Sequence, residues 1–391
     1  MTEVVITKLP IASFSYFQWF LLGVYFLQEE KKVKLKYRIF PLNYLVLLLF
    51  NNKYLAGGLR RLFNVCLKYP NYNLVGYIKY GNKKRTFTID SKDSPFIFND
   101  KLLEKVDVYY KMQCPKEINE LGFPLNNIIR VPYSDVKFNS FKDKTNLKRR
   151  LSKNVFKYKN KIKPAMVGPR RLAWGCRFKD LYKTYCGYLE GQSVEKEQNM
   201  MCYFGSNLEP KTSGKQGKYD LDLEWNNMRL YSGIMEHPNL KRYKASQIIS
   251  KDENNDARVI VVKKDSGKTE INKDKIIPLS EFCSFVAHFQ YNFNVSGFRL
   301  SIPNRFIESF IVGTAIFTDK LYLKWYLPFD SEVKETVDMG YYRDEDVNWG
   351  QFEKDLYALP KVCKKEIIEL YRKKWAPEVY ANYIITTTLK A

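Results

Sequence analysis

The first thirty residues combine a short run of β-branched residues with a long apolar segment that is rich in aromatic side chains. The run EVVITKLP predicts a buried strand followed by a loop. The segment SFSYFQWFLLGVYFLQEEKK then predicts a helix that begins near Ser13 or Ser15 and ends in charged residues. A strand, a loop and a helix in this order are typical of an α/β protein.

Similar patterns continue along the chain. Four more segments predict strands: VKLKYRIF, YLVLLLF, NLVGYIKYG and KRTFTID. The segment LLEKVDVYYKM predicts a short helix that leads into a strand. A second α/β series begins at EKEQNMMCYFGSN and continues through ASQIISKDENNDARVIVVKK and SEFCSFVAHFQYNFN. The last segment, 361–391, predicts a long amphipathic helix that is broken at Pro377.

The length of 391 residues exceeds the size at which a single hydrophobic core usually stops growing. We therefore expect two α/β domains, 1–190 and 191–364, followed by a C-terminal helix, 365–391. Seven cysteines without a CxxC pair and only two histidines indicate neither a disulfide framework nor a zinc site, which favours the reducing cytosol.

The charge is strongly basic, with 65 Lys and Arg against 42 Asp and Glu and a formal net charge of +23. Such a charge favours an anionic partner, and nucleic acid, anionic lipid and phosphorylated substrates all satisfy it. We expect membrane headgroups and a diphosphate ligand, and no nucleic acid; the alternative is a basic surface that is only solvated. The N-terminus lacks the features of a signal peptide, and the most apolar stretches, 17–27 and 44–50, are too short to cross a bilayer. We expect a cytoplasmic protein that is peripheral at the inner face of the membrane.

Contact with an anionic membrane is expected to involve the first domain. The candidate surface combines the aromatic helix 13–27 with basic residues near Lys53, Arg60, Arg61 and Lys68.

The segment SGFRLSIPNRFIESFIVGTAIFTDK, 296–320, concentrates charge between two apolar runs. It predicts a loop closed by Pro303, a short helix over 304–312 that Gly313 ends, and a strand. Free backbone N–H groups at a helix start attract phosphate, and arginines add bidentate donors. Glu308, near the first turn, can accept hydrogen bonds from ribose hydroxyls. The alternative is that Arg305 and Glu308 form an ordinary surface ion pair.

This segment resembles the donor-binding loop and helix of GT-B glycosyltransferases, in which a proline or arginine, an apolar pair and a Glu precede a Gly and a strand. The text RFIESFIVGTAIFTD, followed by KWYLPF, is particularly similar to the C-terminal half of exostosin-type glycosyltransferases. The first half of the chain matches that family only in its α/β pattern. The resemblance implies two Rossmann-like domains that face each other across a cleft. Domain 1–190 would bind the acceptor, domain 191–364 would bind the nucleotide sugar, and 365–391 would pack back on the first domain.

The resemblance also implies donor contacts in the loop and the helix start: Arg299, Ser301, Asn304, Arg305 and Glu308. Retaining GT-B enzymes often carry a second Glu eight positions earlier. Leu300 stands there in this chain, which favours an inverting mechanism.

Further donor contacts are expected where the backbone or a basic side chain can approach a diphosphate. These candidates are Gly205, Ser206, Lys241, Arg242 and Arg258. The alternatives are an ordinary β-turn at Gly205 and Ser206, and a basic helix start capped by Asn239.

An inverting transferase needs a base near the acceptor hydroxyl. The text TFTIDSKDSPFIF places Asp90 at a predicted strand end and Asp93 in the following loop, where ligand-facing groups lie in α/β sheets. Asp93 is the candidate base and Asp90 a candidate acceptor contact. Lys111 and Gln113, at the next strand end, are further acceptor candidates. The alternative is that both aspartates cap turns or a helix.

The leading hypothesis is a metal-independent glycosyltransferase. It would move a sugar from a nucleotide-sugar donor, UDP- or GDP-linked, to a glycan or lipid-linked saccharide in cell-surface polysaccharide synthesis, with no cofactor. One alternative is a GT-A enzyme that holds a metal through the DxD spacings Asp220–Asp222 or Asp344–Asp346. The other is a non-catalytic protein that binds nucleic acid through its charge and its 29 tyrosines.

Overall fold

The structure is a computed structural model of the full chain. It describes residues 1–10, 13–39, 72–92, 97, 100–116, 154–169, 199–203, 207–208, 246–249, 256–257, 260–263, 283, 286–287, 289–294, 301–318, 321, 323–329, 333, 335–338 and 359–391.

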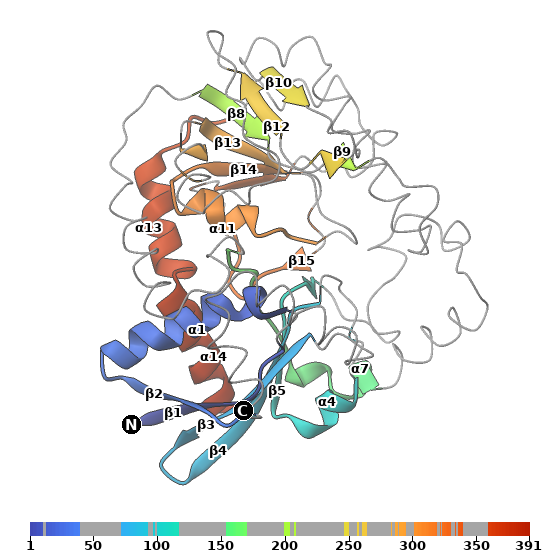
Figure 1. The fold of residues 1–391 in the computed structure, drawn as a ribbon, viewed down its shortest axis with the longest axis vertical. Coiled ribbons are helices and arrows are strands. Elements are labelled where there is room, and N and C mark those ends of the chain that lie inside the picture. The colour runs from blue at the N-terminus through green and yellow to red at the C-terminus, as the bar shows by residue number, and fades with distance from the viewer. Residues whose placement is uncertain are drawn as a thin grey trace, which may run out of the picture.

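The first half forms a six-stranded mixed sheet, and its strand order is β2-β1-β3-β4-β5-β7 (Figure 1). Its strands are β1 (Thr2–Lys8), β2 (Val33–Tyr37), β3 (Asn73–Tyr80), β4 (Lys83–Asp90), β5 (Val108–Lys111) and β7 (Ile162–Pro164). β3 is antiparallel to both of its neighbours, whereas β1 pairs in parallel with β2, and β5 pairs in parallel with β4 and β7. The carboxyl ends of all strands except β3 therefore share one edge.

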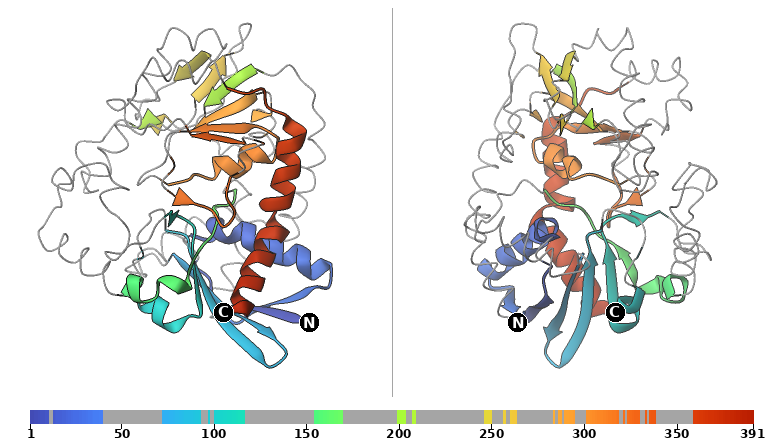
Figure 2. Two further views of the ribbon diagram at one scale, coloured as in Figure 1. Left: turned by 180° about the vertical axis from the view of Figure 1, so that it is seen from behind. Right: turned by 45° about the vertical axis from the view of Figure 1, so that its right-hand side comes forward.

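Helices cover both faces of this sheet (Figure 2). α1 (Phe14–Glu29) connects β1 to β2 and packs on α14 (Pro377–Lys390), which also contacts β3 and β4. α4 (Asp100–Lys105) connects β4 to β5 and packs on α7 (Asn154–Lys157), which a 3-10 helix, Lys159–Lys161, follows. The strand and helix predictions for this half are confirmed wherever the residues are described, whereas the predicted strand 44–50 lies outside them.

The second half forms a four-stranded parallel sheet with the order β16-β14-β13-β8. Its strands are β8 (Asn199–Tyr203), β13 (Phe289–Asn294), β14 (Ala315–Thr318) and β16 (Thr336–Asp338). α11 (Arg305–Phe310) connects β13 to β14 and packs on α13 (Lys364–Lys374). The structure is thus an α/β protein, as the sequence predicts, and the predicted domain boundary near 190 lies outside the described residues.

Three short strand pairs complete the described secondary structure. β10 (Ser246–Ile249) pairs with β12 (Ile260–Lys263), β9 (Asn207–Leu208) pairs with β11 (Asp256–Ala257), and β6 (Cys114–Pro115) pairs with β15 (Leu323–Lys324).

Local sequence explains the ends of α11. Asn304 is its N-cap residue, and Gly313 follows with a φ of +73°. A Cβ at Gly313 would lie 2.6 Å from the carbonyl oxygen of Lys364, so this turn requires glycine both for its conformation and for the approach of α13. The predicted helix start near Asn304 and its stop at Gly313 are therefore confirmed.

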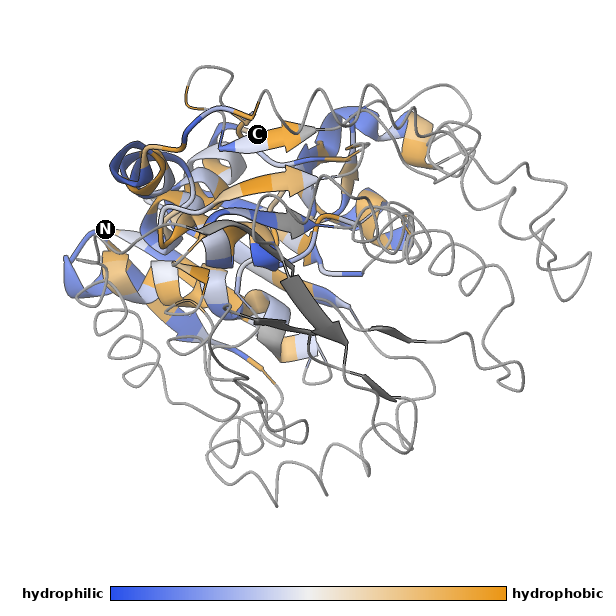
Figure 3. Cartoon of the chain, turned by 90° about the horizontal axis from the view of Figure 1, so that it is seen from above, coloured by the Kyte–Doolittle hydropathy of each residue, from blue (hydrophilic) through white to orange (hydrophobic). Residues whose placement is uncertain are grey.

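One hydrophobic core joins the two halves, and hydrophobic residues gather where helices and strands pack together (Figure 3). Trp375, between α13 and α14, is fully buried and stacks on Phe310 with ring centroids 5.0 Å apart. Its carbonyl oxygen accepts a hydrogen bond of 3.1 Å from the indole N–H of Trp19 in α1. One residue thus contacts a helix from each half of the molecule.

The aromatic residues of α1 belong to this core. Phe17, Trp19 and Phe20 are fully buried, so the expectation that helix 13–27 faces a membrane is wrong. The basic residues expected to accompany it, near Lys53 and Lys68, lie outside the described residues. No helix in the described part of the chain is both long and apolar enough to span a membrane.

The packing of α1 on α14 predicts the effect of one small substitution. A Cβ at Gly23 would lie 1.8 Å from the carbonyl oxygen of Pro377. We expect Gly23→Ala to lower the free energy of unfolding by about 1 to 3 kcal/mol, as overpacking does. In an exposed helix the same change raises stability by about 1 kcal/mol, so the sign of the effect in urea unfolding decides whether this contact exists.

Glu378, in the first turn of α14, predicts a pH dependence of stability. Burial raises the pKa of its carboxyl above the ordinary value of 4.5, and the nearby charge of Glu30 adds to the shift. Since the folded state then binds this proton more tightly than the unfolded state, its contribution is present at low pH and is lost as pH rises. We expect Glu378→Gln to raise the unfolding midpoint at neutral pH and to lose this advantage below pH 4.5.

The matched control for this experiment is Glu366→Gln, which changes an exposed glutamate in the first turn of α13. A gain of equal size in both variants, or one that does not depend on pH, would contradict the assignment of the effect to burial of Glu378.

Candidate functional site where the two sheets meet

A buried ion pair lies at the carboxyl ends of two neighbouring parallel strands. Asp90 ends β4, Lys111 ends β5, and the two residues are register partners. The Lys111 Nζ lies 3.1 Å from Asp90 Oδ2, and the two side chains are 0% and 4% exposed. Carboxyl edges of α/β sheets are where ligand-facing groups usually lie, so this pair occupies a favourable position for function.

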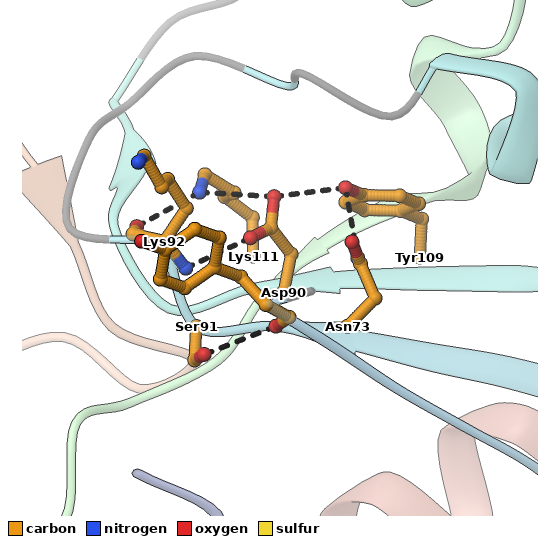
Figure 4. Close-up of polar contacts among 7 residues, drawn as sticks. Asn73, Asp90, Ser91, Lys92, Tyr109 and Lys111 are labelled. Atoms are coloured by element: carbon orange, nitrogen blue, oxygen red, sulfur yellow. Dashed lines mark hydrogen bonds and ion pairs between the residues drawn. The ribbon is translucent and has the colours of Figure 1, made fainter. Parts of the chain in front are cut away.

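Neighbouring groups satisfy the remaining hydrogen-bonding capacity of the pair (Figure 4). Tyr109 donates its hydroxyl proton to Asp90 Oδ2 at 2.8 Å and accepts a bond of 3.3 Å from Asn73 Nδ2. The backbone N–H of Lys92 donates to Asp90 Oδ1 at 2.9 Å, and Lys111 Nζ donates to the Lys92 carbonyl oxygen at 3.1 Å. Removing two charges from water is costly, and such bonds are what make a buried pair tolerable.

The cluster fixes the start of the loop after β4. Ser91 donates from both its backbone N–H and its hydroxyl to the carbonyl oxygen of Tyr72, each at 3.0 Å. The Lys92 ammonium lies 4.2 Å from the centre of the Tyr72 ring. Asp93, the candidate base, comes next in the sequence but lies outside the described residues. Asp90 and Lys111 both bond to the backbone of Lys92 and so hold the first residues after β4 in place.

Gln113 links the carboxyl edge of the first sheet to the second half of the chain. Its Nε2 donates to the carbonyl oxygen of Ile302, and its Oε1 accepts from the Ile302 N–H, both at 3.0 Å. Ile302 lies between the end of β13 and the start of α11, at the carboxyl edge of the second sheet. The β6–β15 pair adds a second link, because β6 follows β5 and β15 follows β14. Loops at the carboxyl edges of the two sheets therefore meet at this junction.

On the other side of this junction, the first turn of α11 holds a buried carboxylate. Glu308 is 0% exposed, and its Oε1 accepts a hydrogen bond of 2.6 Å from Asn304 Nδ2. Ser301 is also buried, and Arg305 is partly exposed. The alternative of an exposed Arg305–Glu308 surface pair is wrong, because the Glu308 side chain does not reach the surface.

Polar residues inside β13 and β14 were not anticipated from the sequence. Asn294 Nδ2 donates to Thr318 Oγ1 at 3.0 Å, at the carboxyl ends of both strands. Asn292 Nδ2 donates to Ser309 Oγ at 2.9 Å, and this hydroxyl donates to the Arg305 carbonyl oxygen. The amide oxygen of Asn294 has no hydrogen-bond partner within the described ranges. The sequence feature that could have indicated them is the pair of asparagines in the strand segment FQYNFN.

Cys114, beside Lys111 in this region, is not a reactive thiol. Burial raises its pKa to about 11, although the charges of Lys324 and Lys111 oppose the shift. At neutral pH it is therefore protonated and acts as a small apolar residue.

The structure thus brings together Asp90, Lys111 and Gln113, and connects them to the loop that carries Ser301, Asn304, Arg305 and Glu308. The other predicted site residues lie outside the described residues: Asp93, Gly205, Ser206, Lys241, Arg242, Arg258 and Arg299. The aspartates of both DxD spacings lie outside them as well. Within the described segments, no group of His, Cys, Asp or Glu side chains could hold a metal ion.

Comparison of the chain with models of known protein families gives no match, and comparison with curated proteins gives none either. What the protein does must therefore be inferred from its own residues.

The buried ion pair predicts a strong dependence of each partner on the other. We expect Lys111→Met to lower the free energy of unfolding by about 3 to 5 kcal/mol, because it leaves the Asp90 carboxylate buried without its counter-charge. The double variant Asp90→Asn/Lys111→Met should recover part of that loss. Urea unfolding of the full chain measures both, and Lys101→Met, on the exposed side of α4, is the control with an expected effect within about 0.5 kcal/mol. A double variant that is no more stable than Lys111→Met would contradict the coupling between the two side chains.

Proposed function

We propose that the protein is a glycosyltransferase of the GT-B type, with two Rossmann-like domains. It would move a sugar from a nucleotide-sugar donor to a saccharide or lipid-linked acceptor in cell-surface polysaccharide synthesis. The observation that carries the proposal is that loops from the carboxyl edges of two separate sheets meet, joined through Gln113 and Ile302. One edge can bind a donor and the other an acceptor. Group transfer requires the bound donor and the bound acceptor to lie next to each other.

The packing of the C-terminus supports the same proposal. α13 packs on α11 of the second half, and α14 packs on α1, β3 and β4 of the first. A chain that ends by crossing from the second sheet to the first is expected in a GT-B enzyme, as the resemblance in 296–320 implies. Pro377, at the first position of α14, marks the point at which the direction changes.

We assign the donor to the second sheet. Ribose hydroxyls would donate to the Glu308 carboxylate, which Asn304 holds in orientation and which donor binding would have to uncover, because it is buried in the free protein. Ser301 and Arg305 would contact the diphosphate from the start of α11, together with Arg299, Lys241, Arg242 and Arg258. Gly205 and Ser206, which follow β8 in the sequence, would allow the backbone to approach the same phosphates.

We assign the acceptor to the first sheet. The cluster of Asp90 and Lys111 would position the loop after β4, from which Asp93 would remove the proton of the acceptor hydroxyl. This carboxylate acts as a general base, and the sugar is transferred with inversion as the nucleoside diphosphate leaves. The arginines and lysines of the donor surface would stabilise the departing charge without a metal ion. The reaction would take place in the cytoplasm, at the inner face of the membrane.

Binding of nucleoside diphosphates tests the proposal directly. Because hydrogen bonds to a charged group contribute about 1.5 to 3 kcal/mol, we expect Glu308→Gln to weaken UDP or GDP binding roughly 10- to 150-fold. Isothermal titration calorimetry of the full chain measures this affinity, and a nucleotide-sugar screen then identifies the donor. Glu366→Gln, in the exposed first turn of α13, is the matched control and should bind like the unaltered protein. A folded Glu308→Gln variant with unchanged affinity would exclude Glu308 as a donor contact.

A further inference from the structure

The strand register places charged residues in one row across four strands of the first sheet. Lys34 on β2 lies beside Glu3 on β1, Glu3 lies beside Lys79 on β3, and Lys79 lies beside Lys84 on β4. Register partners project from the same face, and neighbouring strands lie about 4.8 Å apart, so this cationic row is about 14 Å long. The three lysines are exposed.

The one negative charge in the row, that of Glu3, is neutralised by a neighbouring lysine. Lys36 forms an ion pair with Glu3, the single acidic residue of the row. The pKa of Glu3 lies below its usual range because Lys36 donates a hydrogen bond to it and because Lys79 and Lys34 add positive charge. The three lysines of the row therefore present a net positive surface to solvent.

One pair in the row is unfavourable for folding. Lys79 and Lys84 lie directly opposite each other, and like charges in such positions destabilise a sheet. The Lys84 ammonium lies 4.2 Å from the centre of the Tyr77 ring, which offsets part of the repulsion. The turn itself requires no lysine, because Gly81, with a φ of +56°, provides the conformation of the two-residue hairpin loop. An anionic partner over the row would relieve the remaining repulsion.

The surroundings of the row favour a lipid surface over other polyanions. Tyr80 and its register partner Lys83, at the hairpin tip, project from the face opposite to the row, and Tyr80 is 59% exposed. Tyrosines and lysines are the residues that anchor proteins at the headgroup level. A flat surface at this end would meet both faces of the hairpin tip. Lys83 donates a hydrogen bond to the Leu389 carbonyl oxygen, which brings the exposed Lys390 to the same end. This hairpin projects at the end of the molecule that carries both termini, away from the second sheet, so a flat surface can reach it (Figures 1 and 2).

We propose that the docking end, formed by the cationic row with Tyr80, Lys83 and Lys390, binds the anionic phospholipids of a membrane surface. Asp90 lies six residues from Lys84 along β4, which corresponds to roughly 20 Å at 3.3 Å per residue. A membrane at the docking end would thus leave the carboxyl edge of the first sheet roughly 20 Å above the headgroups, within reach of a lipid-linked glycan. That last step rests on the proposed function, whereas the docking itself does not.

Vesicle sedimentation of the full chain tests the docking end, with vesicles of phosphatidylglycerol and phosphatidylcholine in equal parts. Each basic residue near an anionic surface contributes about a fivefold factor to binding, so Lys79→Gln/Lys84→Gln should bind roughly 30-fold more weakly. The control variant Lys365→Gln/Lys373→Gln removes the same charge from the exposed face of α13 and should bind like the unaltered protein. Tyr80→Ser should weaken vesicle binding and leave binding to duplex DNA unchanged.

Three results would overturn the proposal. Equal losses in the two double variants would assign binding to the net charge of the whole protein. Unchanged binding of the Lys79 and Lys84 variant would exclude the cationic row. Preference for duplex DNA over the vesicles would make this end a nucleic-acid interface. Nucleotide affinity, measured on the same variants, should not change, so a failure here is distinguishable from a failure of the proposed function.

Discussion

The burial of Trp375 is the constraint on which the arrangement of the two halves depends. Its ring stacks on Phe310 of α11, and its carbonyl oxygen accepts from Trp19 of α1, so it can be satisfied only when both sheets are in place. Exposure of a side chain of this size would cost roughly 1.5 to 3 kcal/mol in lost apolar burial alone. Because Pro377 follows two residues later, the chain turns at this point into α14, which closes the core of the first sheet.

The meeting of loops from the two carboxyl edges follows from this junction. With α13 held on α11 and α14 held on α1, the loops after β5 and β13 come together, and Gln113 bonds to the backbone of Ile302 at their contact. An amide side chain that satisfies both a backbone N–H and a C=O group tolerates little displacement. The polar residues on either side, Asp90 and Glu308, are therefore fixed relative to each other by rigid elements, as a precise site requires.

Local features of the sequence were sufficient to predict the individual elements. The end of the helix before Gly313 depends on a positive φ, which is a local feature, whereas the Asn304 side chain bonds to Glu308 and makes no capping hydrogen bond. The antiparallel direction of β3 could not be predicted, because an alternating strand pattern reports burial and not direction. The burial of the α1 aromatics was missed for a related reason, since a helix that is apolar on most sides is buried only when a partner such as α14 arrives from the far end of the chain.

The difference between local features and contacts of distant segments also explains which parts of the site could be predicted. Asp90 and Lys111 were recognisable as strand ends, but their pairing is a consequence of the β4–β5 register, which joins residues 21 positions apart. The sequence of β4 itself gives the strand two chemically different ends on one face, because Lys84, Thr86, Thr88 and Asp90 all project from the same side. Between these ends, Thr86 is partly buried and donates to the Asp107 carboxylate from its backbone N–H and its hydroxyl. Thr88 is fully buried, and its hydroxyl donates to the Leu74 carbonyl oxygen. A single strand without a bulge in its pairing with β3 thus connects an exposed cationic end to a buried polar end. Whatever orients the first end is therefore expected to orient the second as well, since β4 pairs with β3 along its whole length and with β5 over its last four residues.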